Sequence, residues 1–269
     1  RDLEYASLEL EKNIEQDNPD LLKWINMLMA PGSSLGGARP KASVQDVNGE
    51  LWIAKFPSKD DLIDTGAWEM VANEMAQMCG INTAVAMVKR FNSKYHTYLT
   101  KRFDRINNKR LHFSSVMTLL GYTDGASAAD GVSYLEIAEF IILNGANVDA
   151  DLRELFKRIV FSIAISNTDD HLRNHGFILT KDGWGLSPVY DINPNYYRGG
   201  LKLNISENDN SQDFSLALSV APFFRLSVSE AEKIINNIKE VVYGWRTFAS
   251  KYKIPKSEQD FMSQAFLFS

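Results

Sequence analysis

The stretch that decides the fold reads Ser166-Asn167-Thr168-Asp169-Asp170-His171-Leu172-Arg173-Asn174, and it is followed by Ser187-Pro188-Val189-Tyr190-Asp191-Ile192-Asn193-Pro194. An attacking hydroxyl needs a nearby carboxylate to orient it and to accept its proton, and Asp169 is suited to this task. The charge on a transferring phosphoryl group must also be neutralised, and Mg²⁺ prefers oxygen ligands such as those of Asn174 and Asp191. An Asp, an Asn five positions later and a second Asp beyond two strands is the order typical of kinase catalytic loops. The sequence therefore predicts phosphoryl transfer.

Two other interpretations of these residues are open. Asp, Asn and Thr are common in loops and helix caps, where their side chains bond to nearby backbone groups. His171 and His175 are four positions apart and, on a helix, would share a face as zinc ligands do. Against zinc, no Glu follows His171 as in the His-Glu-x-x-His motif, and Cys79 is the only cysteine. The combination of side chains favours phosphoryl transfer more than any one of them does.

Composition and charge narrow the class of protein. The chain has 269 residues, 45% of them hydrophobic, which allows a sizeable core in one large domain or two lobes. The single cysteine, Cys79, excludes an internal disulfide framework, so we expect a cytoplasmic protein. Apolar runs such as residues 159–161 are too short to cross a bilayer, and no leader sequence opens the chain, so we expect no membrane contact. A net charge of −5 argues against a broad nucleic-acid surface, and any DNA contact would be indirect.

A glycine-rich segment precedes two predicted strands. It reads Pro31-Gly32-Ser33-Ser34-Leu35-Gly36-Gly37-Ala38-Arg39-Pro40-Lys41, and its glycines would let backbone N–H groups approach phosphate oxygens. It is not a Walker A loop, because Ala38 occupies the position of the required lysine. A linker is the alternative interpretation. The strand-like runs at residues 42–47 and 51–56 flank Asn48-Gly49, which predicts a hairpin with a two-residue loop.

The second of these strands carries a candidate nucleotide-binding lysine. Lys55 is placed like the kinase lysine that contacts the ATP phosphates, and an exposed edge lysine is the alternative. Residues 68–78 have a helical composition. Glu74 on this helix could pair with Lys55 as the corresponding glutamate does in kinases, and Glu69 is the competing choice.

Later elements bring the motif residues together. The patterns predict a short hinge strand at residues 98–105, helices at 134–143 and 152–166, and strands at 177–180 and 184–186. The second helix leads into Asp169, and the two strands return Asp191 towards Asn174. A capping box of Ser229 and Glu232 is predicted to begin the last long helix.

Five segments, taken in order, resemble the HipA family of bacterial serine/threonine kinases, the toxin halves of toxin and antitoxin pairs. They are Ser34-Leu35-Gly36-Gly37-Ala38-Arg39-Pro40-Lys41, Trp52-Ile53-Ala54-Lys55-Phe56-Pro57, Lys101-Arg102-Phe103-Asp104-Arg105, Thr168-Asp169-Asp170-His171-Leu172-Arg173-Asn174 and Tyr190-Asp191-Ile192. The Asp-x-His-x-x-Asn arrangement also resembles the catalytic loop of phosphatidylinositol kinases. The resemblance covers most of the chain. It implies an α+β fold, two-lobed and protein-kinase-like or phosphatidylinositol-kinase-like, with a smaller lobe at residues 1–104 and a mostly helical lobe at residues 105–269.

The resemblance implies a role for each motif residue. Asp169 would be the catalytic base, and Asn174 and Asp191 would bind Mg²⁺. Lys55 and His171 would contact the ATP phosphates. The glycine-rich loop would hold the same phosphates through Ser34, Gly36, Gly37 and Ala38.

The resemblance also implies a hinge that holds the nucleoside and a serine that regulates the loop. Phe103 would pack on adenine and Asp104 would hydrogen-bond the ribose. Lys101 stands where relatives often have an acid, which leaves base recognition by side chains open. Ser34 would be autophosphorylated, and its phosphate would compete with ATP for the same backbone donors and inactivate the kinase.

Partners follow from the same resemblance. Substrates in the family are aminoacyl-tRNA synthetases, and the usual partner is a small helix-turn-helix antitoxin that binds operator DNA. Many relatives carry a further N-terminal subdomain, whereas only residues 1–30 precede the glycine-rich segment here, so a separate small protein would supply that part or it has been removed. Two other functions stay open, a catalytically silent nucleotide-binding scaffold in a repressor complex and a small-molecule or lipid kinase.

Overall fold

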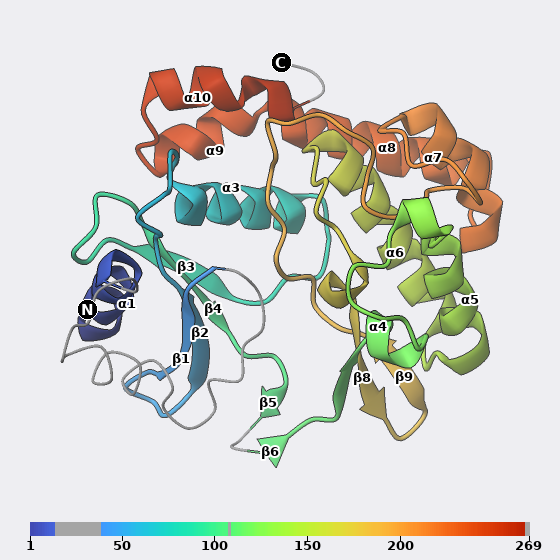
Figure 1. Cartoon of the computed structure of the whole chain (residues 1–269). Coiled ribbons are helices and arrows are strands. Elements are labelled where there is room, and N and C mark those ends of the chain that lie inside the picture. The colour runs from blue at the N-terminus through green and yellow to red at the C-terminus, as the bar shows by residue number, and fades with distance from the viewer. Residues whose placement is uncertain (14–38, 107–108, 267–269) are drawn as a thin grey trace.

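The computed structural model describes residues 1–13, 39–106 and 109–266. The first part of the chain forms a four-stranded antiparallel sheet with the strand order β1-β2-β4-β3 (Figure 1). Its strands are β1 (Lys41–Gln45), β2 (Leu51–Lys55), β3 (Ala86–Lys89) and β4 (Thr97–Lys101). Helix α3 (Thr65–Met78) packs against β3 and β4, and Glu4 of α1 (Asp2–Asn13) accepts the backbone N–H groups of Asn92 and Ser93, which lie between these two strands.

The predicted hairpin is confirmed, but its loop has one residue more than expected. The N–H of Asp46 donates to the carbonyl of Glu50 at 3.0 Å, and Gly49 turns the chain with a left-handed φ of 80°. The N–H of Gly49 donates to the carbonyl of Asp46, so Glu50 is the first residue that pairs again with the opposite strand. Residues 47–49 therefore form a three-residue loop that ends at a glycine. The register therefore places Lys41 directly opposite Lys55. Residues directly opposite each other share one face of the sheet.

The rest of the chain is mostly helical. A three-stranded sheet in the order β7-β8-β9 lies beside the helices, and a short ribbon of β5 and β6 precedes it (Figure 1). The strands are β5 (Arg105–Ile106), β6 (Lys109–Arg110), β7 (Phe113–Ser115), β8 (Gly176–Thr180) and β9 (Gly183–Leu186). The helices are α4 (Val116–Leu119), α5 (Tyr134–Asn144), α6 (Val148–Ala164), α7 (Phe214–Val220), α8 (Val228–Tyr243), α9 (Trp245–Lys251) and α10 (Lys256–Met262). The helices and strands that flank the motif thus form where the sequence predicts them, and the domain boundary at residue 104 stays a prediction.

Helix α3 covers the sheet, but most of its buried side chains pack into the core of the helical region. Trp68 lies 5.8 Å from Trp245, and Trp245 stacks on Phe266 at 4.3 Å between ring centroids. The indole N–H of Trp68 and the backbone N–H of Asp64 both donate to Oε1 of Glu258, at 2.9 and 2.8 Å. The buried residues of α3 are continuous with those of α5, α6 and α8. The helical core therefore fixes the position of α3.

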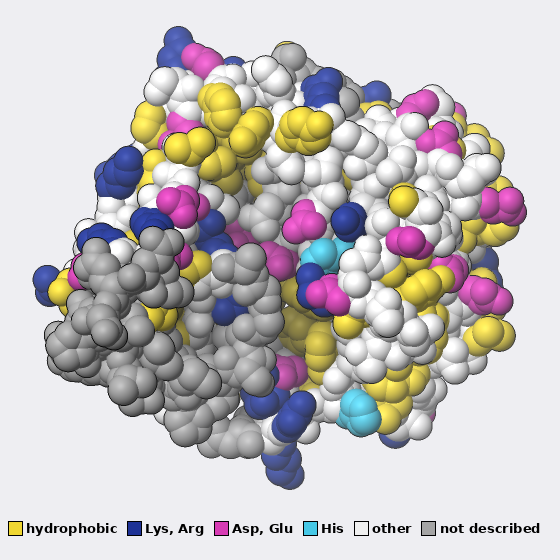
Figure 2. Space-filling view, viewed as in Figure 1, with side chains coloured by type: hydrophobic (Ala, Val, Ile, Leu, Met, Phe, Trp, Pro, Cys, Tyr) yellow, Lys and Arg dark blue, Asp and Glu magenta, His cyan; other side chains and the backbone are white. Residues whose placement is uncertain are grey.

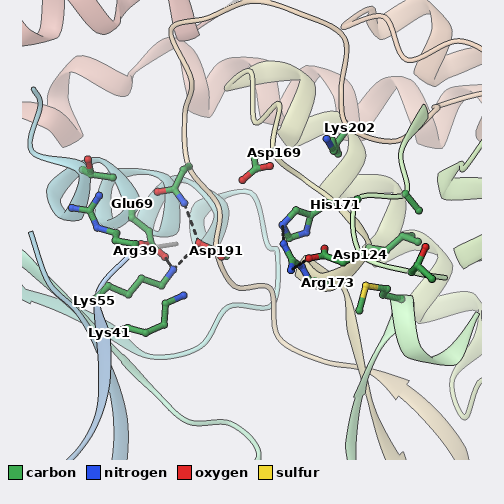
Figure 3. Close-up of a pocket in the computed structure, with 17 residues that line it drawn as sticks. Arg39, Lys41, Lys55, Glu69, Asp124, Asp169, His171, Arg173, Asp191 and Lys202 are labelled. Atoms are coloured by element: carbon green, nitrogen blue, oxygen red, sulfur yellow. Dashed lines mark hydrogen bonds and ion pairs between the residues drawn. The ribbon is translucent and has the colours of Figure 1, made fainter. Parts of the chain in front are cut away.

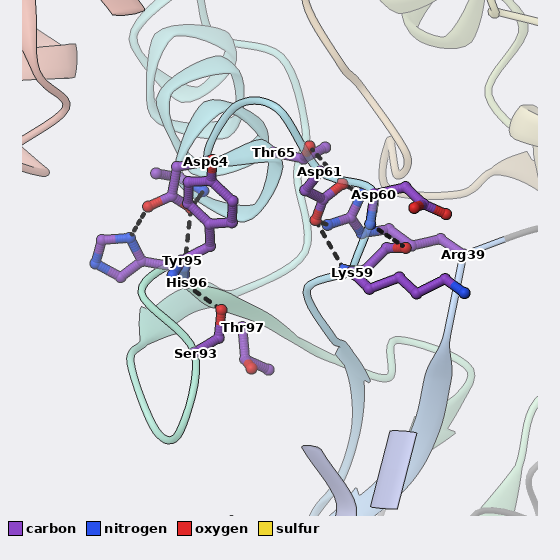
Figure 4. Close-up of polar contacts among 12 residues, drawn as sticks. Arg39, Lys59, Asp60, Asp61, Asp64, Thr65, Ser93, Tyr95, His96 and Thr97 are labelled. Carbon is purple, nitrogen blue, oxygen red and sulfur yellow. Dashed lines mark hydrogen bonds and ion pairs between the residues drawn. The ribbon is translucent and has the colours of Figure 1, made fainter. Parts of the chain in front are cut away.

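The start of α3 is held by a buried carboxylate. Asp64 caps the helix, and its Oδ1 accepts the N–H groups of Ala67 at 3.2 Å and His96 at 2.9 Å (Figure 4). Its Oδ2 lies 2.6 Å from Nδ1 of the same histidine. Nearby, the guanidinium of Arg39 binds Asp61 through two contacts of 3.0 and 2.5 Å. These contacts tie α3 to β4 and to the residues that precede β1.

The predicted cap of helix α8 is wrong by two residues. Ser227 is the N-cap, and Glu230 closes the capping box by accepting from the Ser227 N–H at 3.0 Å. Ser229 and Glu232, which were expected to form the box, lie inside the helix. Both frames have the Ser-x-x-Glu spacing, so the sequence motif alone does not choose between them. In the part of the chain that the structure covers, no helix is both long and apolar enough to cross a membrane.

The close approach of Gly66 to β4 gives a test of this arrangement. A Cβ at Gly66 would lie 2.2 Å from the backbone carbonyl oxygen of His96, which cannot move without shifting the sheet. We expect Gly66→Ala to lower the free energy of unfolding by about 1–3 kcal/mol, the usual cost of overpacking. In Gly185→Ala the new methyl would meet its nearest atom at 3.9 Å, so the change should stay within about 1 kcal/mol. Urea unfolding measures both, and equal midpoints would contradict the close contact.

Candidate active site

A buried ion cluster joins β2, α3 and the segment after β9. Nζ of Lys55 lies 2.5 Å from Oε1 of Glu69 and 2.8 Å from Oδ1 of Asp191 (Figure 3). Lys55 and Glu69 are buried, whereas the carboxylate of Asp191 is 39% exposed. Burial alone would lower the pKa of Lys55, but the two carboxylates outweigh it and raise that pKa above its usual value. Lys55 is therefore a fully charged ammonium at neutral pH.

Asp191 is held in an unusual backbone conformation. Its φ is 60°, in the left-handed region that Asp and Asn tolerate better than most other side chains. Burial would raise the pKa of its carboxyl group, but the charge of Lys55 and its hydrogen bond outweigh that effect and lower the pKa. The side chain is therefore an ionised carboxylate, and Oδ1 also accepts from the amide of Asn193 at 3.3 Å.

The loop that contains Asp169 is braced by its own residues. The amide Nδ2 of Asn174 donates to the backbone carbonyl of Asp169 at 3.0 Å, and the N–H of His171 donates to the same oxygen at 2.9 Å. The carboxylate of Asp169 is exposed and faces the cavity. Asn174 is buried, and the oxygen of its amide takes no part in the bond that braces the loop.

A buried polar network around Asp170 supports this loop on the side that faces the protein interior. Asp170 accepts from the hydroxyl of Tyr134 at 2.7 Å and from that of Ser162 at 3.2 Å. Nε2 of His175 lies 3.0 Å from Oδ1 of the same carboxylate. Burial would raise the pKa of Asp170, but the histidine and the two hydroxyl groups outweigh it and lower the pKa. The network links the loop to α5 and α6, and the sequence prediction did not include it.

A cavity of about 420 Å³ lies between the sheet and the helical region. Figure 2 shows acidic, basic and histidine side chains gathered around a hollow on this face. The basic side chains that line it are those of Arg39, Lys41, Lys55, Arg173 and Lys202, the acidic ones are those of Glu69, Asp124, Asp169 and Asp191, and His171 lies among them. Burial is the main cause that lowers the pKa of Lys41 below its usual value. The cavity thus brings both predicted aspartates, the predicted lysine and His171 together.

The expected pairing of Glu74 with Lys55 is wrong. The carboxylate of Glu74 instead accepts from Lys251 at 2.6 Å and from the hydroxyl of Tyr252 at 2.5 Å, both on or next to α9. Glu69, the competing choice, makes the contact. Five residues along a helix turn a side chain by more than a third of a circle, so the two glutamates point to different surroundings.

Some predicted nucleotide contacts lie away from this cavity. Lys101, the last residue of β4, pairs with Glu50. Phe103 packs among aromatic rings, and Asp104 is engaged by Arg102 at 2.7 Å. None of the three predicted hinge residues lines the cavity that the described residues form. The predicted loop contacts, Ser34, Gly36, Gly37 and Ala38, lie outside the described residues.

The zinc interpretation is not supported by the geometry. His171 and His175 lie at the two ends of a short 3₁₀ turn, so they do not share the face of an α-helix. His171 faces the cavity, whereas His175 is buried against Asp170. Across residues 1–13, 39–106 and 109–266, no group of three or more His, Cys, Asp or Glu side chains could hold a metal ion. Mg²⁺ is commonly bound by only one or two carboxylates plus substrate phosphates, so the predicted Mg²⁺ ligands, Asn174 and Asp191, stay a prediction.

The arrangement resembles known kinase structures. The chain superimposes on HipA from a Shewanella oneidensis complex of HipA, HipB and operator DNA with a TM-score of 0.67 and 18% identity, over 86% of this chain and 62% of that chain. It superimposes on the Helicobacter pylori proinflammatory kinase CtkA with a TM-score of 0.56 and 12% identity, over 84% of this chain and 88% of that chain. At these identities the likeness shows the fold, which is kinase-like as the sequence predicts.

Two sequence comparisons concern the family to which the chain belongs. A Haemophilus influenzae protein named "Putative kinase" is 33% identical over 118 residues, which are 41% of this chain and 34% of that protein. The chain therefore spans about a third of that relative and less than two thirds of the Shewanella HipA chain. The model of the HipA-like C-terminal domain matches residues 33–245. This match extends over most of the chain and includes the ion cluster and the Asp169 loop, so the chain belongs to the family of HipA-like C-terminal domains.

Proposed function

We propose that this chain is an ATP-dependent serine/threonine protein kinase. The observation that carries the proposal is the single cavity in which Asp169, Asp191 and Lys55 meet. The buried ion cluster sets the position of Lys55 and Asp191, and the braced loop presents Asp169 without a partner for its carboxylate among the described residues. A cavity that combines an uncommitted carboxylate with several cations suits an anionic substrate and an acceptor that must lose a proton.

The chemistry follows from these positions. Asp169 accepts the proton of the acceptor hydroxyl as the acceptor oxygen bonds to the γ-phosphorus. The bond between that phosphorus and the β,γ-bridging oxygen breaks, and ADP leaves with the electron pair. Lys55 binds phosphate oxygens, and Asp191 with the amide oxygen of Asn174 would hold Mg²⁺, which neutralises phosphate charge when bound. Catalysis of this kind consists of positioning and charge stabilisation.

The finer parts of the proposal rest on the family. By analogy with the HipA, HipB and operator DNA complex of Shewanella oneidensis, the partner would be a small helix-turn-helix antitoxin, and DNA would be contacted through it. We propose that the chain is cytoplasmic and acts on a protein substrate, with an aminoacyl-tRNA synthetase as the first candidate, and that Ser34 is autophosphorylated. The N-terminal subdomain of many relatives would come from a separate small protein or from a part of the chain beyond this sequence.

The role of Asp169 can be tested by removing its charge. We expect Asp169→Asn to keep its affinity for Mg·ATP, because Lys55 and Asp191 are unchanged, and to lose transfer by at least about 10²-fold, the usual contribution of a general base. Calorimetric titration measures the binding. Mass spectrometry of a bacterial lysate incubated with ATP and either form identifies the phosphorylated sites, Ser34 included.

The same experiment separates the proposal from its rivals. Phosphosites that appear with both forms would refute the role of Asp169. Mg·ATP binding without any phosphorylated protein would favour the silent scaffold, and labelled metabolites or lipids without labelled protein would favour a small-molecule or lipid kinase. A differential protein phosphosite would support the kinase and identify its target.

The choice between the two glutamates of α3 gives a second test. Glu69→Gln removes one of the two charges that hold Lys55, so we expect phosphotransfer to fall by about tenfold or more, as for loss of a hydrogen bond to a charged group. Glu74→Gln is the matched control on the same helix, and because its partners lie on or next to α9, transfer should stay within about twofold. Initial rates with a common acceptor compare the two. Equal losses in both variants would contradict the assignment.

A further inference from the structure

Most charged side chains in the cavity already have a partner. Lys55 is held by two carboxylates, and Arg173 binds Asp124 at 2.8 Å. Arg39 is bound by Asp61 through both ends of its guanidinium group. Lys41 and Lys202 differ, since no ion pair or side-chain hydrogen bond joins either ammonium group to another residue in the described part of the chain. Two half-buried lysines that line a cavity without a partner are suited to bind an anionic ligand.

Lys41 reaches the cavity from the sheet. It lies directly opposite Lys55 in the β1–β2 register, so the two side chains extend from the same face (Figure 3). Lys55 contacts Asp191, and the charge of that carboxylate also acts on Lys41. An anion bound by Lys41 would therefore lie at the end of the cavity that Lys55 and Asp191 form.

Lys202 reaches the cavity from the helical region, on the side of Asp169 (Figure 3). Its neighbours Leu201 and Leu203 are buried, with 1% and 0% exposed. The backbone carbonyl of Lys202 accepts from the N–H of Ala128 at 2.8 Å. This anchored backbone presents the ammonium group from a fixed point, on the same side of the cavity as Asp169, the proposed proton acceptor.

We propose that the two lysines bind different parts of one triphosphate, with Lys202 binding the terminal phosphoryl group and Lys41 the phosphates nearer the nucleoside. This inference rests on the proposed kinase function and adds a residue from the segment after Asp191 to it. Lys202 would stabilise the charge on the phosphoryl group that is transferred to the acceptor at Asp169. Charge-assisted contacts to phosphate of this kind are strong and directional.

Nucleotides that differ only in the terminal phosphoryl group test the assignment. The probes are Mg·ADP and the Mg²⁺ complex of the non-hydrolysable analogue AMP-PNP, titrated calorimetrically into the full chain. We expect Lys202→Met to weaken AMP-PNP binding by roughly tenfold and to leave ADP binding unchanged, because it removes one contact to a charged group. Lys41→Met should weaken both nucleotides by a similar factor. Lys202→Arg should restore most of the preference for AMP-PNP, since it keeps the charge.

Lys181→Met is the matched control, because Lys181 is an exposed lysine in the turn between β8 and β9. It should change neither affinity. Unchanged AMP-PNP binding in Lys202→Met would overturn the inference. Equal loss of ADP and AMP-PNP binding in that variant would overturn it as well. If the native chain binds neither nucleotide, the proposed function itself fails, which is distinguishable from both outcomes.

Discussion

The site depends on one buried ammonium group and the two carboxylates around it. A cation taken out of water loses several kcal/mol of hydration, which only close and well-directed negative charge can replace. Lys55 meets this requirement through Glu69 and Asp191, which come from α3 and from the segment after β9. Three distant segments must therefore be in place together. Because Trp68 on α3 packs against Trp245 on α9, the helical core sets the position of α3 and, through Glu69, that of Lys55 on the sheet.

The parts of the fold that the sequence predicts well are those set by local interactions. The strands on both sides of Asn48-Gly49, the helix that leads to Asp169 and the pair of strands before Asp191 all form as expected. The predicted two-residue loop of the hairpin is wrong, and a one-residue shift in register moves a side chain to the other face of a sheet. With a two-residue loop Lys41 would not lie opposite Lys55. The extra residue is decided by the backbone of Gly49, which the dipeptide motif does not specify.

The errors in the site arise where tertiary packing selects among similar residues. Both glutamates of α3 are compatible with a helix, and only the contact of the helix with α9 shows that Glu74 is already engaged there. His175 has the spacing of a metal ligand relative to His171, but burial pairs it with Asp170. The adjacent aspartates Asp169 and Asp170 could have predicted the buried network. Because Asp169 faces the cavity, Asp170 points to the other side of the loop, where its buried carboxylate needs hydrogen-bond donors.

The left-handed backbone at Asp191 has a consequence for how such a protein can change over time. Three residue types, Gly, Asn and Asp, occupy this conformation readily, whereas others cost about 1–2 kcal/mol. Only one of the three is negatively charged. A single substitution of Asp191 by Asn or Gly would therefore remove the charge and keep the backbone conformation, which would give a relative that folds but does not catalyse. In evolution, the fold and the catalytic activity of such a protein can be lost separately.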